Sequence, residues 1–426
     1  MTDLTRRDWI RVAGGVGVAG LAGCSALRDD PPSDDDPSGN GDPSGNGTPS
    51  DDGESPLGSE SSNGLTSQFR AGLRNTGYLD VTIPDNVKTE WAVPTNEGDH
   101  SASKGSPVMA PSGAIILADD TGRIRSLSSS GGTNWSTSVS DDDRGSHGTA
   151  AIADGTAYIG TYDGVVSAVS VEDGDIEWQT EVGGSAAASP TYYEGKLYVA
   201  VEHADPSGSV VVMDADSGEI EWRDRRPTDH PHSTVAIDVE RDRFLFGSND
   251  GHVYAWSLSD LEREWTYDTG GDVKAPIAVS RGIAVVPSWA ETVTGVDVED
   301  GSRVWEFQAD GDIMCAPAVH DDTVYVGSHD SNAYAIDLAT GEEQWSTPTD
   351  GWITGSAVAT NEHVLIGSYD AKLYALDQAD GSVTWSVEGL GDVTSAAYAT
   401  DDAIYYAERA PEDTDEAGMC YKLVEA

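Results

Sequence analysis

The sequence is poor in basic residues. Only 24 Lys and Arg stand against 75 Asp and Glu among 426 residues, which gives a formal net charge of −51. Proteins that bind nucleic acids need clustered Lys and Arg to contact phosphates, and attachment to anionic lipids by charge needs a polybasic segment. The composition therefore predicts that this protein binds no nucleic acid and is not held at a membrane by its charge.

Cysteine is also scarce, with three residues, so a hydrophobic core rather than disulfides must hold the fold together. The apolar run at residues 12–22 is too short to span a membrane comfortably. Nucleophile-elbow, phosphate-loop and HExxH motifs do not occur in the sequence. These absences leave an acidic, core-forming protein without a recognisable catalytic motif.

The acidic residues are spread along the whole chain, and only six of the basic residues are Lys. This balance resembles that of proteins from salt-loving archaea, in which dense carboxylates keep the protein hydrated. Molar salt shortens the Debye length to ~3 Å and screens the self-repulsion of such a surface. We therefore expect a halophilic protein of haloarchaeal origin, the alternative being an ordinary acidic secreted protein.

The N-terminus carries two signals in register. Arg6 and Arg7 precede the apolar run and resemble a twin-arginine (Tat) export signal, which implies translocation of a folded protein. Leu21-Ala22-Gly23-Cys24 resembles a lipobox, in which the chain is cut before the cysteine and its thiol receives a lipid. We expect removal of residues 1–23, lipidation of Cys24, and an extracellular lipoprotein anchored to the outer side of the cytoplasmic membrane.

Residues 24–67 are rich in Asp, Pro, Ser and Gly, and include the repeated hexapeptide Asp-Pro-Ser-Gly-Asn-Gly. Such a segment buries too little apolar surface to offset the entropy of ordering. We expect it to be a disordered acidic tether that holds the remaining residues, 68–426, away from the membrane.

Tryptophan recurs every 40 to 44 residues along the rest of the chain. The eight positions of this series are Trp91, Trp135, Trp178, Trp222, Trp265, Trp305, Trp345 and Trp385. Around each one the same pattern returns, with short apolar strands separated by Asp/Gly turns such as Asp163-Gly164. A four-stranded unit of this length is typical of a propeller blade.

The end of each unit carries a more specific signal. Ala335, Gly341 and Trp345 have a spacing that returns in two further units, at 168, 174 and 178 and at 375, 381 and 385. This spacing resembles the tryptophan-docking motif of the PQQ-like repeat family, in which each indole packs between neighbouring blades. Leu261 replaces the Gly, and Arg125 the Ala, in two units, where we expect weaker docking.

We predict an all-β, eight-bladed propeller of four-stranded antiparallel blades. Three strand-like segments follow Trp385, and a strand around Trp91 precedes the first complete unit. The N-terminal strand is therefore expected to supply the outer strand of the last blade, which closes the ring and leaves no exposed sheet edge.

One face of the predicted ring differs from blade to blade, in the loops before each first strand and between the second and third strands. Aromatic, His and Arg side chains are enriched in contact surfaces. The candidate binding residues are Tyr162, Trp289, His329, Trp352, Tyr369, Arg409, His230 and His232.

Alternatives remain open for several of these positions. Asp residues before the inner strands either cap their own turns or converge as a cation- or ligand-binding ring. His230 and His232 could bind zinc only with a third ligand from another blade. Trp289 and Trp352 serve either ligand or partner contact or inter-blade packing, so no metal site is assigned.

The resemblance implies two functions. Quinoprotein dehydrogenases of this repeat family hold PQQ over a stacking Trp and beneath a vicinal Cys pair, with calcium bound by Glu and Asn. Cys315 and Cys420 are far apart in this sequence, and every unit is close to minimal length. The chain is more similar to the non-catalytic lipoprotein propeller of outer-membrane assembly. We therefore expect a membrane-anchored binding or scaffolding propeller that contacts an unknown protein or small ligand and has no cofactor. A PQQ- and calcium-dependent dehydrogenase is the alternative.

Overall fold

The computed structural model describes residues 65–96, 105–142, 144–411, 414 and 416–426. The export signal at Arg6 and Arg7, the lipidation site at Cys24 and residues 24–64 of the tether lie outside the described residues. Within the part described, no helix is long and apolar enough to cross a membrane.

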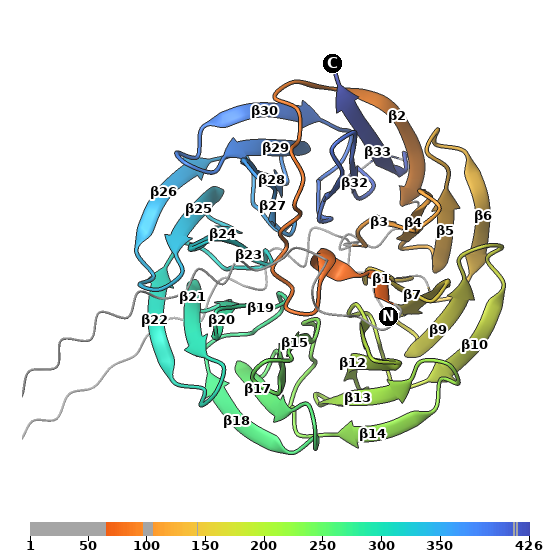
Figure 1. The fold of residues 1–426 in the computed structure, drawn as a ribbon, viewed down its shortest axis with the longest axis vertical. Coiled ribbons are helices and arrows are strands. Elements are labelled where there is room, and N and C mark those ends of the chain that lie inside the picture. The colour runs from red at the N-terminus through yellow and green to blue at the C-terminus, as the bar shows by residue number, and fades with distance from the viewer. Residues whose placement is uncertain (1–64, 97–104, 143, 412–413, 415) are drawn as a thin grey trace, which may run out of the picture. The chain divides into compact units, whose positions relative to one another are not determined.

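Eight antiparallel sheets form a propeller around a central channel, as Figure 1 shows. Named from the channel outward, blade 1 contains β3 (Val108–Met109), β4 (Ile115–Ala118), β5 (Arg123–Leu127) and β6 (Thr133–Ser138), and blade 2 contains β7 (Ala151–Ala153), β8 (Thr156–Gly160), β9 (Val165–Ser170) and β10 (Ile176–Glu181). Blade 3 contains β11 (Thr191–Tyr193), β12 (Lys196–Glu202), β13 (Gly208–Asp214) and β14 (Ile220–Asp224), and blade 4 contains β15 (Ala236–Asp238), β16 (Arg243–Gly247), β17 (His252–Ser257) and β18 (Arg263–Asp268). The prediction of an eight-bladed all-β fold is confirmed.

The other blades repeat this plan. Blade 5 contains β19 (Ala278–Ser280), β20 (Ile283–Ser288), β21 (Thr292–Asp297) and β22 (Arg303–Gln308), and blade 6 contains β23 (Ala318–His320), β24 (Thr323–Gly327), β25 (Asn332–Asp337) and β26 (Glu343–Pro348). Blade 7 contains β27 (Val358–Ala359), β28 (His363–Gly367), β29 (Lys372–Asp377) and β30 (Val383–Glu388). Blade 8 contains β31 (Tyr398–Ala399), β32 (Ile404–Ala407), β33 (Gly418–Glu425) and, at its rim, β2 (Val87–Asn96).

Ring closure follows the prediction. The N-terminal strand β2 pairs antiparallel with the C-terminal strand β33, so that Lys88 lies opposite Val424 and Trp91 opposite Lys422. Blade 8 thus takes its outer strand from the start of the chain and its other three strands from the end. No edge of blade 8 is left between the first and last blades, which explains how the ring avoids an open sheet edge.

Burial differs between inner and outer strands for a simple reason. Second strands such as β8 are buried at every position, because they are packed between the sheets of two neighbouring blades. Outer strands such as β10 alternate between exposed and partly buried residues, because one of their faces meets solvent. The burial pattern along a strand therefore indicates whether it lies inside the blade or at its rim.

The docking tryptophans join one blade to the next. Seven of them, at positions 91, 135, 178, 265, 305, 345 and 385, donate their indole N–H to a backbone carbonyl 2.6–3.1 Å away in the neighbouring unit. The glycine at the following turn has positive φ and lies against the ring, as Gly381 (φ 72°) does against Trp345. A Cβ there would approach the indole to 2.5 Å, so this turn requires glycine.

Leu261 has its effect on the preceding blade. It adopts the left-handed conformation of the glycine that it replaces, with φ 60°. Trp222, whose docking position this is, makes no indole hydrogen bond within the described residues and packs edge-on against Trp256, at 6.4 Å between ring centroids. Trp256 instead donates its indole N–H to Asp224, at 3.0 Å. The substitution is therefore accommodated by an aromatic cluster in blade 4.

Arg125 does not lie at a docking position. Ser126 pairs with Trp135 across β5 and β6, whereas Ala335 pairs with Trp345 in blade 6. The connection in blade 1 is one residue shorter, so Arg125 faces away from the indole and forms an ion pair of 2.6 Å with buried Asp119. The expectation that Arg125 loosens the docking of Trp135 was therefore wrong.

An element absent from the sequence-based prediction crosses the channel. We call residues 65–85, which include β1 (Leu65–Ser67) and the 3-10 turn η2 (Phe69–Ala71), the channel-crossing segment. In Figure 1 it is drawn in orange and runs across the middle of the ring before the chain reaches β2 at the rim. Its first strand pairs with β7, so Leu65–Ser67, which the prediction assigned to the tether, are part of the sheet of blade 2.

The channel-crossing segment contacts the blades in order. After β1 has paired with blade 2, the side chain of Gln68 accepts a bond from Tyr192 of blade 3. Backbone bonds then follow to the inner strands of blades 4, 5, 6 and 7, at Ile237, Val279, Val319 and Ala359, with distances of 2.7–2.9 Å. Finally, Thr82 N–H donates to Asp401 of blade 8 at 3.0 Å. One short segment thus ties together seven of the eight inner strands or their turns.

Candidate functional site

The loops singled out from the sequence lie together at one face of the ring. In blade after blade, the residue that follows the second strand donates its backbone N–H to the loop before the inner strand. The donors and acceptors are Tyr162 and Gly145, Asn249 and His230, Trp289 and Asp272, His329 and Asp312, Tyr369 and Trp352, and Arg409 and Asp392, at 2.8–3.1 Å. Both sets of variable residues are therefore held against each other within each of these six blades.

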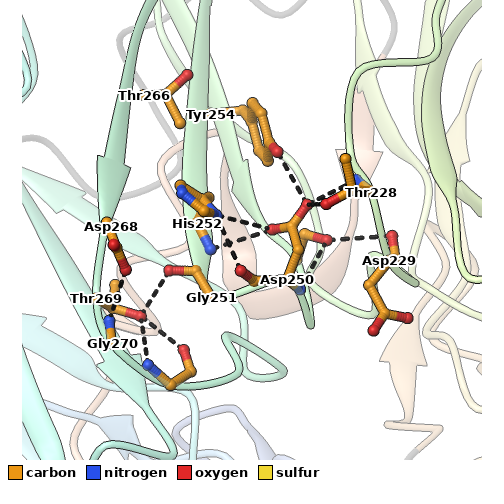
Figure 2. Close-up of polar contacts among 12 residues, drawn as sticks. Thr228, Asp229, Asp250, Gly251, His252, Tyr254, Thr266, Asp268, Thr269 and Gly270 are labelled. Carbon is orange, nitrogen blue, oxygen red and sulfur yellow. Dashed lines mark hydrogen bonds and ion pairs between the residues drawn. The ribbon is translucent and has the colours of Figure 1, made fainter.

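A repeated aspartate fixes the geometry of these turns. Figure 2 shows the example in blade 4, where Asp250 accepts bonds from the backbone N–H of His252 (3.1 Å), the hydroxyl of Tyr254 (2.9 Å) and the backbone N–H of Thr228 (2.7 Å). Asp330 and Asp370 repeat the bond to a tyrosine hydroxyl in blades 6 and 7. A carboxylate with several donors holds the turn and the adjoining loop rigidly, so the side chains that they carry are pre-positioned.

Six side chains of blades 5 to 8 form what we call the contact arc: Lys274, Trp289, His329, Trp352, Tyr369 and Arg409. The Lys274 ammonium lies 3.3 Å from the centre of the Trp289 ring. His329 stacks on Trp352 with 5.1 Å between ring centroids and 15° between planes. Tyr369 follows at 6.3 Å from Trp352. The aromatic rings therefore extend over blades 5 to 7, with Lys274 against the ring at one end and Arg409 against the ring at the other.

Trp352 is the exposed member of the contact arc, at 50% of its maximum, between the more buried rings of His329 and Tyr369. Arg409 is buried at 4% exposure. Its guanidinium lies 4.8 Å from the Tyr369 ring centre and 2.9 Å from Asp392, so it supports Tyr369 rather than reaching solvent. The arc thus presents an apolar ring on a rigid polar base.

The other three candidates lie elsewhere on this face. Tyr162 of blade 2 is buried, and its hydroxyl is 2.9 Å from His147 Nδ1, while Arg144 lies over its ring at 4.7 Å. Burial, reinforced by Glu202, raises the pKa of the Tyr162 hydroxyl. His230 and His232 precede blade 4, where His232 pairs with Glu202 at 2.9 Å and His230 bonds the carbonyl of His203. The sequence grouped these residues with the contact arc, but the structure separates them.

The aspartates before the inner strands are engaged with nearby partners. Asp272 pairs with Lys274 at 3.3 Å, Asp350 with Lys372 at 3.1 Å, and Asp229 accepts the N–H of His230 at 2.7 Å. Burial raises the pKa of Asp312, with Lys274 acting in the opposite direction. In the described part of the chain, no three His, Cys, Asp or Glu residues are arranged to hold a metal ion. Their geometry favours turn capping and ion pairing over a cation ring.

A groove lies between blades 1 and 2. Its volume is about 410 Å³, and its walls include Asp141, Asp163, Gln179 and Glu181. The Ser140 hydroxyl donates to Asp163 at 2.8 Å within it. This acidic groove is separate from the contact arc, whose members belong to blades 5 to 8.

Sequence comparison assigns the family. The family described as outer membrane protein assembly factor BamB matches residues 120–260, 206–351 and 310–413, which together make up more than half of the chain. The chain belongs to the BamB family. BamB of Yersinia pestis is 25% identical to it over 173 residues, or 36% of this chain and 43% of that protein. The match thus spans less than half of the relative's length.

Solved structures extend the comparison to the whole fold. BamB from Moraxella catarrhalis has a TM-score of 0.63 at 17% identity, covering 79% of this chain and 97% of that one. A europium-containing methanol dehydrogenase reaches 0.74 at 11% identity, with coverage of 85% and 98%. Quinohemoprotein alcohol dehydrogenase from Comamonas testosteroni reaches 0.73 at 12% identity, with coverage of 86% and 82%. At these identities the similarities show a common fold.

The residues of this BamB-family chain do not fit a quinone cofactor. The resemblance of the repeats to those of quinoprotein dehydrogenases implies an adjacent Cys pair and a stacking Trp for such a cofactor. Cys315 and Cys420 are instead buried, unlinked, and placed in blades 6 and 8. Trp352 is the exposed candidate for stacking, and His329 already covers one of its faces. We therefore derive no reaction step through such a group.

Proposed function

We propose that this protein is a non-catalytic binding propeller of the BamB family, whose contact arc holds a partner protein. The observation that carries the proposal is Trp352, half exposed and supported by His329 of the neighbouring blade 6 and by Tyr369 of its own blade 7. Tryptophan and tyrosine on a rigid base are the residue types that dominate binding energy at protein interfaces. The family description, an assembly factor, supports a role in contact with other proteins.

The test is crosslinking on intact cells of the native host, with the full chain carrying Trp289→Ala and Trp352→Ala. We expect the crosslinked partner seen with the wild-type chain to be lost. A matched control carries Val304→Ala and Val383→Ala, which remove apolar side chains of 46% and 47% exposure from outer strands β22 and β30. Loss of the partner in the control, or its retention in the tryptophan variant, would remove the contact arc from the proposal.

An enzymatic assay addresses the alternative. The chain purified from its host in high salt is supplied with PQQ and calcium, and dye-linked alcohol oxidation is recorded together with the absorption spectrum. We expect no turnover and no stoichiometric quinone. Oxidation that depends on both additions would replace the binding proposal by a dehydrogenase.

We further propose that the propeller is exported by the twin-arginine route and anchored outside the cytoplasmic membrane through a lipid on Cys24. Arg6, Arg7 and the Leu-Ala-Gly-Cys motif in the sequence support this location. Cys24→Ser is expected to move the protein from the membrane fraction to the medium, whereas Arg6→Lys with Arg7→Lys is expected to retain it inside the cell. Membrane association of the Cys24→Ser protein would contradict the anchor.

We also propose that the protein is adapted to concentrated salt, as its net charge of −51 suggests. Lower salt lengthens the range of repulsion between carboxylates. The thermal midpoint of unfolding should therefore fall steeply when potassium chloride is diluted from molar to 0.1 M. A midpoint independent of salt would indicate an ordinary acidic protein.

A further inference from the structure

The channel-crossing segment contains a buried arginine whose charge is not balanced by any carboxylate among the described residues. Arg70 is 6% exposed and has a left-handed backbone, with φ 56°. Its Nη2 donates to the carbonyls of Ala357 at 2.8 Å and Thr76 at 3.5 Å. Its Nε and Nη1 are buried and have no hydrogen-bond partner within the described residues. The guanidinium therefore has donors to spare in the interior of the channel.

Arg74, four residues later in the same segment, shows how such a charge is normally balanced. Its Nη2 lies 3.1 Å from Asp238 and 3.1 Å from Glu240. Arg70 has no such ion pair among the described residues, although the chain has 75 acidic residues. Burial lowers the pKa of Arg70 to about 10, and the ionisable neighbour that counters this is the thiol of Cys315. An unpaired charge in this position carries a substantial desolvation cost.

A small cavity adjoins this arginine. Its volume is about 20 Å³, enough for one water-sized species. The residues with polar side chains in its lining are Gln68, Arg70, Ser106, Thr149 and Tyr398, and its apolar walls include Val108, Val358 and Ala396. No Asp or Glu belongs to this set of described lining residues. The described side chains that line the cavity are therefore neutral or positive.

Gln68 supplies a second unused donor to the cavity. It is 3% exposed, and its Oε1 accepts the backbone N–H of Tyr192 at 3.0 Å. This bond fixes the orientation of the amide, and its Nε2 has no partner within the part of the chain that the structure describes. Two side chains two residues apart in sequence thus present unsatisfied N–H groups around the same space.

We propose that this cavity binds one small monovalent anion of the size of chloride, held by Arg70 and Gln68. Buried donors left unsatisfied are costly, and an anion satisfies them while it also neutralises the guanidinium. A water molecule could fill the same volume but would leave the charge unbalanced. The anion joins the channel-crossing segment to the inner wall of the ring, a structural role that does not depend on the proposed partner.

The site is tested directly with bromide, which replaces chloride and scatters anomalously. Crystals of the full chain grown in sodium bromide should show an anomalous peak in the cavity, within hydrogen-bond distance of Arg70 and Gln68. Gln68→Glu places a carboxylate beside Arg70 and retains the acceptor for Tyr192, so it should remove the peak without unfolding the protein. Ordinary water density without an anomalous peak in the wild-type crystals would overturn the proposal.

Unfolding in solution gives a second readout. Chloride is varied at constant ionic strength, with gluconate as the replacement anion because it is too large for the cavity. Above the dissociation constant, each tenfold increase in chloride should lower the wild-type unfolding equilibrium constant about tenfold. Gln68→Glu should show no such response, and Arg70→Met should lose it if it folds.

Arg74→Met is the matched control, because it removes a paired arginine from the same segment. It should be less stable than the wild type but keep the full chloride response. An identical chloride response in the wild type and Gln68→Glu would contradict the anion site, whatever the fate of Arg70→Met.

Discussion

The channel-crossing segment and the contact arc both draw on residues from several blades, but they do so by different means. The segment binds the inner strands mainly through backbone hydrogen bonds, in which N–H groups of blades 4 to 7 donate to the carbonyls of Leu73, Arg74, Thr76 and Gly77. The contact arc is built from side chains, with a ring or cation contributed by each of blades 5 to 8. Changes to the segment should therefore affect the stability of the ring, and changes to the arc should affect what it binds.

Deleting residues 65–85 should have the largest effect on stability. The deletion leaves the partners of the segment on seven blades without their bonds, each worth ~1 kcal/mol, so the free energy of unfolding should fall by on the order of 5–10 kcal/mol. Calorimetry of the full chain and the deletion variant in molar salt measures the difference. An unchanged thermal midpoint would show that the segment is dispensable and would break the contrast with the arc.

Two tryptophans test whether the contact arc is separate from the packing between blades. Trp345 is 8% exposed and docks blade 6 on blade 7, so Trp345→Ala should cost ~3–5 kcal/mol. Trp352 is 50% exposed, so Trp352→Ala should cost less than ~1 kcal/mol while partner crosslinking is lost. Denaturant unfolding of both variants measures the two losses in unfolding free energy. Equal losses would mean that the contact arc is part of the packing.

Glu408, next to Arg409 of the contact arc, should make the stability of the fold depend on pH. Burial raises the pKa of its carboxyl from 4.5 to about 7, against the opposing bonds from Gly391 N–H and the Tyr421 hydroxyl. Because the folded state binds this proton more tightly, stability should fall as the pH rises from 4.5 to about 7 and then level off. The loss should be roughly 3 kcal/mol, since one pKa unit corresponds to 1.36 kcal/mol.

Glu408→Gln should remove that dependence and be the more stable protein at pH 8. Denaturant unfolding at pH 5 and pH 8 in constant salt measures it. A wild-type protein as stable at pH 8 as at pH 5 would show that the carboxyl is not destabilised by its burial.

Asn75→Ala should have a smaller effect on stability than the deletion of residues 65–85 or Trp345→Ala. Asn75 is buried, and its side-chain amide donates to the carbonyls of Val235 and Ile277, both at 3.3 Å. Loss of both bonds should cost about 2 kcal/mol. Asn361→Ala, which removes an amide bonded to Tyr78 at an exposed position, is the control and should cost less than half as much. Equal costs would argue against a special role for the buried bonds.

The eight blades could be predicted because the same packing contact returns at every blade junction. A docked indole needs a glycine turn and a small residue at fixed spacing, and both residues occur at that spacing in the sequence around Trp178, Trp345 and Trp385. Closure by β2 followed from counting strands after Trp385. These inferences depend on side chains whose shape admits few alternatives.

The channel-crossing segment could not be predicted in this way. Most of its bonds to the blades come from backbone groups, which every residue possesses, so Thr76 and Gly77 carry no signature of their partners. The available signal was compositional: Leu73, Leu79 and Ile83 introduce apolar side chains after the polar tether, and all three are buried. The face of the candidate site was predictable, but the stacking of His329 on Trp352 depends on the register between two blades, which no local pattern encodes.

Closure by β2 also sets the order in which the molecule can be completed. The bond from Trp385 to Pro84 joins residues 301 positions apart, and the bond from Thr82 to Asp401 joins residues 319 apart. These two contacts therefore form only after residues 385 and 401 have been synthesised. Because such distant contacts form slowly, the final docking of β2 on β33 should limit the rate of folding. Until then the chain is an open arc of blades, with the edge of β33 free to pair with another molecule.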